Sequence, residues 1–309
     1  MNLFGGIEAG GTKFVCGFGT GPGDLTMARF PTTSPEETLA SVIRFLKQEA
    51  GGDLRAVGIG SFGPVDLDRN SPTFGYITST PKPGWSNCNL AGTLEQALGV
   101  PTGFDTDVNA AALGEAEWGA GRGLSDLLYL TVGTGIGGGA IVGGRVMHGL
   151  VHPEMGHIRI PHDWTGDPYA GACPYHGDCL EGLASGTAMK ERWGAPAEQL
   201  PPGHAAWSLE ARYLALAAAN LALTLSPQRI VLGGGVLRQP RLFAPIRDQF
   251  LGLLNGYVRH PALAQRIEEY IVPPELGGRA GILGALVLAR DVCAPREVPL
   301  DSQRPRCAT

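Results

Sequence analysis

The stretch TVGTGIGGG, residues 131–139, follows the apolar run LLYL (127–130) and leads into AIVGG (140–144). This order of apolar run, Gly-Thr-Gly turn and second apolar run predicts a β-hairpin. A dinucleotide-binding glycine loop would lead into a helix, and a P-loop would end in Gly-Lys-Ser/Thr; this stretch does neither. The turn therefore predicts a hairpin whose backbone N–H groups can hold a phosphate, because glycine leaves the backbone open to the anion.

Two other glycine turns have a related form. EAGGTK (8–13) lies between two apolar runs and adds the cation of Lys13, and LGGGV (232–236) follows the apolar run RIV. Taken alone, EAGGTK is more typical of an ordinary glycine hairpin turn than of a phosphate-binding loop. Three such loops in one chain are the arrangement expected of an actin-like (ribonuclease H-like) nucleotide-binding fold. We therefore predict a two-domain α/β protein with a cleft between the domains.

The remaining segments fit this interpretation. SPEETLASVIRFLKQEAGG (34–52) predicts a helix with Ser34 as N-cap, Pro35 in the first turn and Glu37 in a capping box. Further helices are expected from about Val108, over about 208–225 and over 280–290, and a buried strand leads into a Gly-Pro loop at 63–64. The hairpins in successive halves suggest two copies of one α/β unit. We predict a small domain at 1–110, to which 290–309 is a candidate addition, and a large domain at 111–289.

Charge and hydropathy exclude several classes of protein. The 309 residues include 24 basic and 29 acidic side chains, for a net charge of −5, and no segment gathers Lys and Arg. Nucleic acid and anionic membrane are therefore not expected as main partners. The sequence does not start with the pattern of a signal peptide, and its longest helical apolar run is short and interrupted by Asn220. We expect a cytoplasmic protein.

Polar residues gather in FDTDVNAAALGE, which starts at Phe104. Asp105, Asp107 and Asn109 precede or open a predicted helix. Asp107 has two compatible interpretations: it caps the helix, or it is a general base that takes the proton of a sugar hydroxyl during phosphoryl transfer.

The segment CPYHGDC (173–179) places Cys173, His176 and Cys179 three residues apart. Upstream, VHPEMGHIRI contains Glu154, which could bind sugar hydroxyls together with Asn109, and His157, which could contact sugar or metal. Disulfides are unexpected in a reducing compartment, and Cys2His2 suits tetrahedral zinc. We predict a structural zinc bound by His157, Cys173, His176 and Cys179. The other cysteines, at 16, 88, 293 and 307, are scattered and are interpreted as ordinary residues.

Together these motifs resemble the ROK family of bacterial sugar kinases, and within it the fructokinase branch, over nearly the whole chain. The resemblance implies ATP with Mg²⁺ as the phosphoryl donor, a hexose as acceptor, a homodimer, and Asp107 as the catalytic base. It places the sugar contacts at Gly63, Pro64, Asn109, Glu154, His157 and Glu181. It places the ATP contacts at Gly10, Gly11, Thr12, Lys13, Gly133, Thr134, Gly135, Gly137, Gly138, Gly233, Gly234 and Gly235.

Two departures from the glucokinase pattern favour fructose as the substrate. ROK glucokinases usually have Asp where this chain has Glu8, and a C-x-C-G-x-x-G-C loop where this chain has C-x2-H-x2-C. Thr106 stands where many members have Asn. The alternatives are a glucokinase, mannokinase or N-acetylmannosamine kinase. Outside enzymes, the alternative is a sugar sensor or repressor. It is disfavoured because the first strand begins almost at Met1, without a helix-turn-helix before it, and because the base is present.

Overall fold

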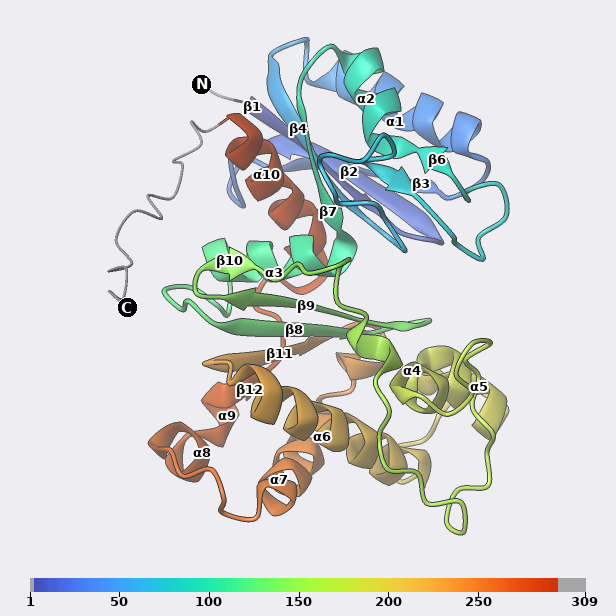
Figure 1. The fold of residues 1–309 in the computed structure, drawn as a ribbon, viewed down its shortest axis with the longest axis vertical. Helices are drawn as coiled ribbons and strands as arrows, with labels where there is room; N and C mark the ends of the chain where they lie inside the picture. Colours follow the sequence, from blue (N-terminus) through green and yellow to red (C-terminus); the bar gives the residue numbers. More distant parts are fainter. Residues whose placement is uncertain (1–2, 294–309) are drawn as a thin grey trace, which may run out of the picture.

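The computed structural model describes residues 3–293, which form two stacked α/β halves (Figure 1). Each half is built on a five-stranded sheet. The first sheet has the order β3-β2-β1-β4-β7, with the bounds β1 Leu3–Ala9, β2 Lys13–Gly19, β3 Thr26–Pro31, β4 Leu54–Ser61 and β7 Thr102–Thr106. The second has the order β10-β9-β8-β11-β12, with the bounds β8 Leu127–Val132, β9 Ile136–Val142, β10 Arg145–Val146, β11 Arg229–Gly233 and β12 Ile271–Val272.

The two sheets share one topology. In the first, β1 to β3 form an antiparallel meander, and β4 and β7 add in parallel on the other side of β1. In the second, β8 to β10 form the meander, and β11 and β12 add in parallel beside β8. The prediction of two copies of one α/β unit is therefore confirmed. The first two glycine loops occupy equivalent turns, between β1 and β2 and between β8 and β9.

Helices cover the sheets as Figure 1 shows. In the first half, α1 and α2 lie over the sheet, and a small hairpin of β5 (Tyr76–Ile77) and β6 (Cys88–Asn89) precedes α2. In the second half, α6 and α7 pack against each other below the sheet. The helix bounds are α1 Pro35–Glu49, α2 Leu90–Leu98, α3 Asp107–Trp118, α4 Leu180–Ala184, α5 Gly186–Trp193, α6 Ala206–Leu225, α7 Phe243–Leu254, α8 Pro261–Gln265, α9 Ile267–Tyr270 and α10 Ala280–Cys293.

The predicted start of α1 is confirmed. Ser34 is the N-cap, its side chain accepts a hydrogen bond from the Glu37 N–H, and Pro35 opens the helix. The proline ring fixes φ near −65°, which suits the first turn of a helix, and the N–H that proline lacks would have no partner there. Leu39, Val42 and Leu46 then repeat on one buried face against the sheet.

The capping interpretation of Asp107 is wrong. The N-cap of α3 is Thr106, whose Oγ1 accepts the Asn109 N–H at 3.1 Å, and Asp107 is the first helical residue. Thr106 has the extended backbone that a cap needs, whereas the Asp107 carboxylate accepts the N–H of its neighbour Val108, at 2.9 Å, and not that of a residue in the next turn. The Asp107 side chain is therefore not required to start the helix.

Helices α3 and α10 pack on each other between the two sheets (Figure 1). Small residues make this possible: a Cβ on Gly284 of α10 would overlap the Ala110 carbonyl of α3, and one on Gly58 of β4 would overlap the Ala285 carbonyl of α10. The C-terminal chain thus returns to the first sheet from residue 280, ten residues before the predicted addition at 290. The rest of that predicted segment, 294–309 with Cys307, lies outside the described residues.

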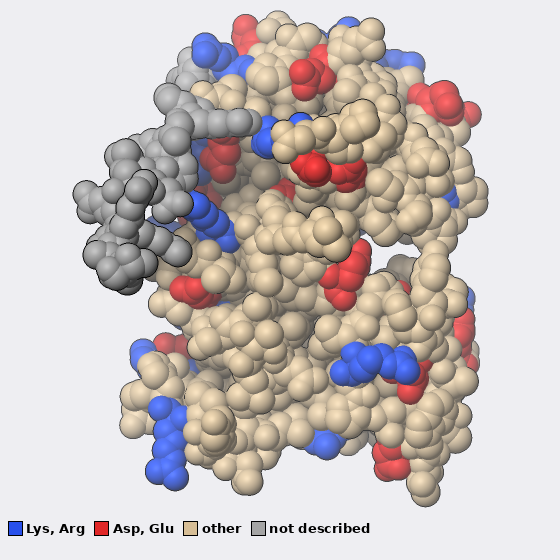
Figure 2. Space-filling model, in the orientation of Figure 1, with Lys and Arg blue, Asp and Glu red and all other residues tan. Residues whose placement is uncertain are grey.

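Figure 2 shows Lys and Arg interspersed with Asp and Glu on this face, and an indentation between the two halves at its right edge. Among residues 3–293, no helix is both long enough and apolar enough to cross a bilayer.

Candidate active site

The first glycine loop closes the β1–β2 hairpin. The Gly10 N–H donates to the Lys13 carbonyl, and the Thr32 N–H donates to the Thr12 carbonyl, which ties the loop to β3. Gly11 has open space around its Cα, and Thr12 and Lys13 are exposed. Just before the loop, one carboxylate oxygen of Glu8, Oε2, is buried and has no hydrogen-bond partner among residues 3–293. Burial raises the pKa of Glu8.

The second loop, 133–135, is held by the helices that follow the Cys/His segment. The Gly133 carbonyl accepts the Gly186 N–H at 2.7 Å, and the Thr134 carbonyl accepts the Thr187 hydroxyl at 2.8 Å. Glu181 reaches the same loop, because its Oε2 accepts the Ile136 N–H at 2.8 Å. A Cβ on Gly135 would lie 2.5 Å from that oxygen. Glu181, predicted as a sugar contact, is thus also a brace of the second loop.

Two predicted nucleotide glycines are not in the turn. Gly137 and Gly138 lie within β9, where an added Cβ would meet Val108 and Leu130, respectively, at 2.8 Å. Close packing against α3 and β8 explains both residues without a ligand. The third loop does need glycine: Gly234 has φ +97°, and a Cβ there would overlap the backbone of Val132.

The three loops do not all border the same cavity. A cavity of about 370 Å³ lies between the halves, within the roughly 300–1,000 Å³ typical of small-molecule sites. Its lining includes Lys13, Asp107, Glu8 and the third loop at 233–235. Thr131, at the end of β8, is the part of the second hairpin that contributes. The sequence interpretation missed the residues Tyr129, Arg238, Pro273, Pro274, Gly277, Gly278 and Gly281. In the sequence, the Gly277-Gly278 pair before the last helix was the available sign that this loop borders a site.

Asp107 lies at the head of α3, where this cavity meets the start of the helix. Burial, followed by the nearby charges of Glu8 and Glu154, raises the pKa of Asp107 to about 7. A carboxyl group with a pKa near neutral pH is suited to accept a proton from a hydroxyl, because proton transfer works best when the pKa matches the operating pH.

Behind Asp107 lies a buried polar chain. Asp105 Oδ1 accepts the Asn109 Nδ2–H at 2.7 Å, and its Oδ2 lies 2.9 Å from His148 Nε2. Asn109 is only 1% exposed, and its Oδ1 has no partner among the described residues. The structure thus gives Asn109 a bracing role beside the base, and its contact with a sugar stays a prediction.

The segment 147–154 crosses from the second half to the first. Buried His152 accepts the Val65 N–H at Nε2, 3.2 Å away, next to Gly63 and Pro64, and its Nδ1 lies 3.4 Å from Glu154 Oε1. Glu154 is 44% exposed. The predicted sugar residues Gly63, Pro64 and Glu154 are therefore brought together by His152, which the sequence interpretation did not assign.

The four predicted metal ligands converge. The ligand atoms of His157, Cys173, His176 and Cys179 all lie within 4.8 Å of one another. His157 Nδ1 is 3.7 Å from Cys173 Sγ and 3.6 Å from Cys179 Sγ, and His176 Nδ1 is 3.6 Å from Cys173 Sγ. With Zn–S and Zn–N bonds of about 2.3 and 2.0 Å, a tetrahedral site has ligand separations of roughly 3.3–3.8 Å. The donor set and its spacing fit zinc.

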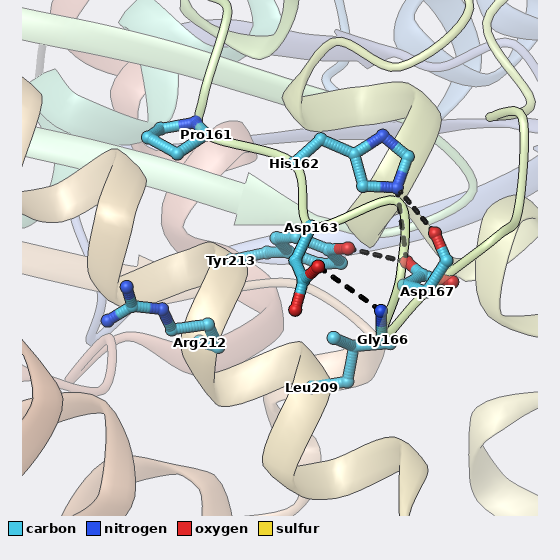
Figure 3. Close-up of a pocket in the computed structure, with 8 residues that line it drawn as sticks. All are labelled: Pro161, His162, Asp163, Gly166, Asp167, Leu209, Arg212 and Tyr213. Atoms are coloured by element: carbon cyan, nitrogen blue, oxygen red, sulfur yellow. Dashed lines mark hydrogen bonds and ion pairs between the residues drawn. The ribbon is translucent and has the colours of Figure 1, made fainter.

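Another cavity, lined by residues of the segment 161–167 and of α6, shows how the Cys/His segment is anchored (Figure 3). Asp167 is its hub: the Tyr213 hydroxyl of α6 donates to the carboxylate at 2.5 Å, and His162 Nε2 lies 2.9 Å from the carbonyl. His162 Nδ1 is in turn 3.2 Å from Asp178, the neighbour of Cys179. Helix α6 thus holds the Cys/His segment through a buried chain that no sequence motif marked.

Comparison with known proteins identifies this arrangement. Residues 4–292 match the ROK family. The chain belongs to the ROK family. A fructokinase of Lactococcus lactis subsp. cremoris is 44% identical over 288 residues, which are 93% of this chain and 96% of that protein. A ROK family glucokinase from Streptomyces griseus, solved in complex with glucose and AMPPNP, is 30% identical, with a TM-score of 0.76 over 94% of this chain and 100% of that chain.

A ROK hexokinase from Thermus thermophilus is 29% identical, with a TM-score of 0.75 over 94% of this chain and 98% of that chain. These solved ROK proteins confirm the predicted fold class, the two-domain actin-like sugar-kinase fold. The predicted membership of the family is confirmed as well.

Proposed function

We propose that this ROK protein transfers the γ-phosphoryl group of ATP to D-fructose and forms fructose 6-phosphate, with Asp107 as the general base. The choice of sugar is supported by relatives named fructokinase, which are 44% identical in Lactococcus lactis and in Zymomonas mobilis. The observation that carries the chemistry is the position of Asp107: its carboxylate, with a pKa raised to about 7, lines the cavity that the third glycine loop also lines.

The nucleotide would bind in the cavity between the halves. The backbone N–H groups of the third glycine loop and the Lys13 ammonium border this cavity and can hold the phosphates of the nucleotide. The contacts of the first two loops with the nucleotide rest on the ROK resemblance. Mg²⁺ bound with ATP would neutralise charge on the phosphates. The buried, unpartnered Oε2 of Glu8 is an oxygen donor of the kind that Mg²⁺ prefers, and we assign Glu8 to that role.

The reaction needs one proton transfer at the acceptor. The 6-hydroxyl proton of the sugar moves to the Asp107 carboxylate, and the hydroxyl oxygen forms a bond to the γ-phosphorus. The bond from that phosphorus to the bridging oxygen breaks, and ADP leaves with the electron pair. Asp105 cannot serve equally, because its carboxylate already accepts the Thr106 N–H and the Asn109 amide and contacts His148.

The sugar would lie where the first half meets the segment 147–157. We assign its hydroxyls to Glu154, which is exposed enough to accept them, and to His157 and Glu181. Gly63, Pro64 and Asn109 complete the proposed site. Since Glu181 also holds the second loop, sugar and nucleotide binding would meet at this side chain.

We also assign a structural zinc to His157, Cys173, His176 and Cys179. All four ligands are protein side chains, so no position is left open for substrate. The ion would fix the segment that has Glu154 at one end and Glu181 at the other, and so would shape the sugar site without taking part in the chemistry.

The proposal is tested by the product. ADP release is measured with ATP and fructose, and the phosphorylated carbon is identified by NMR. We expect ADP release that depends on fructose, with phosphate on C6. Phosphate on C1, or no ADP release with any hexose, would contradict the proposal. ADP release with glucose but not with fructose would favour the glucokinase alternative, which the Streptomyces griseus relative represents.

A further inference from the structure

Helix α3 contains, besides Asp107, a fully buried acidic residue to which the proposed reaction gives no role. Glu115 lies in the last part of the helix that begins with Asp107, and its exposure is 0%. Buried carboxylates are rare unless they are paired or hydrogen-bonded, because loss of water is costly for the charge. No cation pairs with Glu115 among the ion pairs of residues 3–293, so its partners must be sought in the backbone.

Three backbone N–H groups donate to this carboxylate. Oε2 accepts from Ala120 at 2.7 Å and from Glu275 at 3.1 Å, and Oε1 accepts from Leu276 at 2.9 Å. The first contact closes the end of α3. The other two reach 160 and 161 residues along the chain, to the loop that precedes α10. Hydrogen bonds to a charged acceptor are about twice as strong as neutral ones, so this is a firm attachment.

The attached loop borders the cavity assigned to ATP. Pro273 and Pro274 precede the two anchored residues, Gly277 and Gly278 follow them directly, and all four line that cavity. Gly277 has φ +56°, in the left-handed region, so the loop turns sharply just after its anchor. The position of this wall therefore depends on the two N–H groups that Glu115 holds.

The carboxylate has a pocket built for it. Gly119 ends α3 beside Glu115, and a Cβ at Gly119 would overlap Glu115 Oε2. The φ of Gly119 is −121°, which other residues also adopt, so the glycine is needed here for space and not for backbone conformation. Even a methyl group at residue 119 would displace the Glu115 carboxylate.

We propose that Glu115 is a positioning residue for nucleotide binding: its carboxylate fixes the loop at Glu275–Gly278 to the helix that bears Asp107. The inference rests on the proposed function, because it takes this cavity as the ATP site. Helix α3 then positions both the base, at its first residue, and one wall of the nucleotide site, through Glu115 near its end.

The test compares Glu115→Gln with a matched control, Glu117→Gln. Whichever way the new amide is oriented, at least one loop N–H then faces an NH2 group. Glu117 is on the same helix but partly exposed, and is paired with Arg290 at 2.6 Å. Calorimetry with AMPPNP and, separately, with fructose gives the two dissociation constants. We expect the AMPPNP constant of Glu115→Gln to rise about tenfold to a hundredfold, since small misplacements have effects of that size, while the fructose constant stays within about twofold. Glu117→Gln should match the wild type in both.

A second variant allows the inference to be tested even if Glu115→Gln does not fold. Gly119→Ala keeps the Glu115 carboxylate but moves it away from the loop, so it should weaken AMPPNP binding in the same selective way. Added to Glu115→Ala it should have little further effect, since the group it displaces is gone. Unchanged AMPPNP binding in folded Glu115→Gln or Gly119→Ala, or equal losses for AMPPNP and fructose, would overturn the inference. Failure of the wild type to bind AMPPNP at all would overturn the proposed function instead.

Discussion

Replacing Asp107 by Asn removes a proton acceptor and changes almost nothing else in the structure. The side chain keeps its size, its oxygen can still accept the Val108 N–H, and the helix keeps its cap because Thr106 supplies it. Loss of a general base typically lowers the rate about 10²- to 10⁴-fold. That loss corresponds to roughly 3 to 5 kcal/mol of transition-state stabilisation. We expect kcat with ATP and fructose to fall by this factor while both ligands still bind.

The pKa of Asp107 adds a second, independent signature. The carboxyl group must be ionised to act as a base, and its pKa is about 7. In the wild type kcat/KM should therefore rise with pH and level off above 7, and at pH 6 it should be about one tenth of the plateau. The residual activity of Asp107→Asn should lack this rise. Steady-state rates from pH 5.5 to 8.5 measure both profiles.

Asp107→Asn should lower activity without lowering stability at high pH. The pKa of Asp107 is raised above its ordinary value of 3.8, so the folded state binds this proton more tightly than the unfolded state does. The stability that this group contributes therefore falls as the pH rises from about 4 to about 7. Asn carries no charge and escapes that cost, which is about 4 kcal/mol at most. At pH 8 the variant should therefore melt at the wild-type temperature or higher.

Thr106→Ala is the matched control. It removes the side chain that caps α3, so it should lower the free energy of unfolding by about 0.5–2 kcal/mol, and it should keep the rise of kcat/KM near pH 7. The reasoning is refuted if Asp107→Asn retains near-normal turnover, or if it unfolds while Thr106→Ala remains as stable as the wild type.

Three other predictions follow from the zinc site, from the packing and from the family. A chelator should remove one zinc per chain, lower the melting temperature and raise the fructose KM. The variant His176→Ala, which lacks one ligand, should not respond further to the chelator. Less than about half an equivalent of zinc in protein purified without chelator would count against the site. Gly58→Ala should destabilise the fold by about 1–3 kcal/mol because the methyl group would overlap the Ala285 carbonyl, whereas Gly23→Ala, which has open space, should change little. The ROK resemblance implies a homodimer, so light scattering should give about twice the chain mass of 32.3 kDa, and a mass of one chain would contradict it.

The sequence was most informative where a local pattern has a single structural meaning. Glycine turns between apolar runs located the first two hairpins, and a Ser-Pro-Glu-Glu start located α1, because turns and caps depend on residues close in sequence. The four Cys and His residues also met as predicted, since three of them lie within seven residues.

The errors and omissions have a common physical cause. Thr and Asp are both good caps, so choosing between Thr106 and Asp107 requires the backbone angles at each. That Gly137 and Gly138 lie in β9 and pack against Val108 and Leu130 is known only from the structure, and their contact with the nucleotide stays a prediction. The attachment of Glu115 to Leu276 joins residues 161 apart in sequence, and no local pattern can reveal such a contact.

The preference between fructose and glucose tests the central claim most directly. Purified protein is assayed with saturating ATP and Mg²⁺, and kcat/KM is measured for fructose, glucose, mannose and N-acetylmannosamine in the same buffer. The ratio of these values reports the difference in transition-state binding between the sugars. Our account predicts that kcat/KM for fructose exceeds that for each other sugar by about tenfold or more; an equal or higher value for glucose would contradict it.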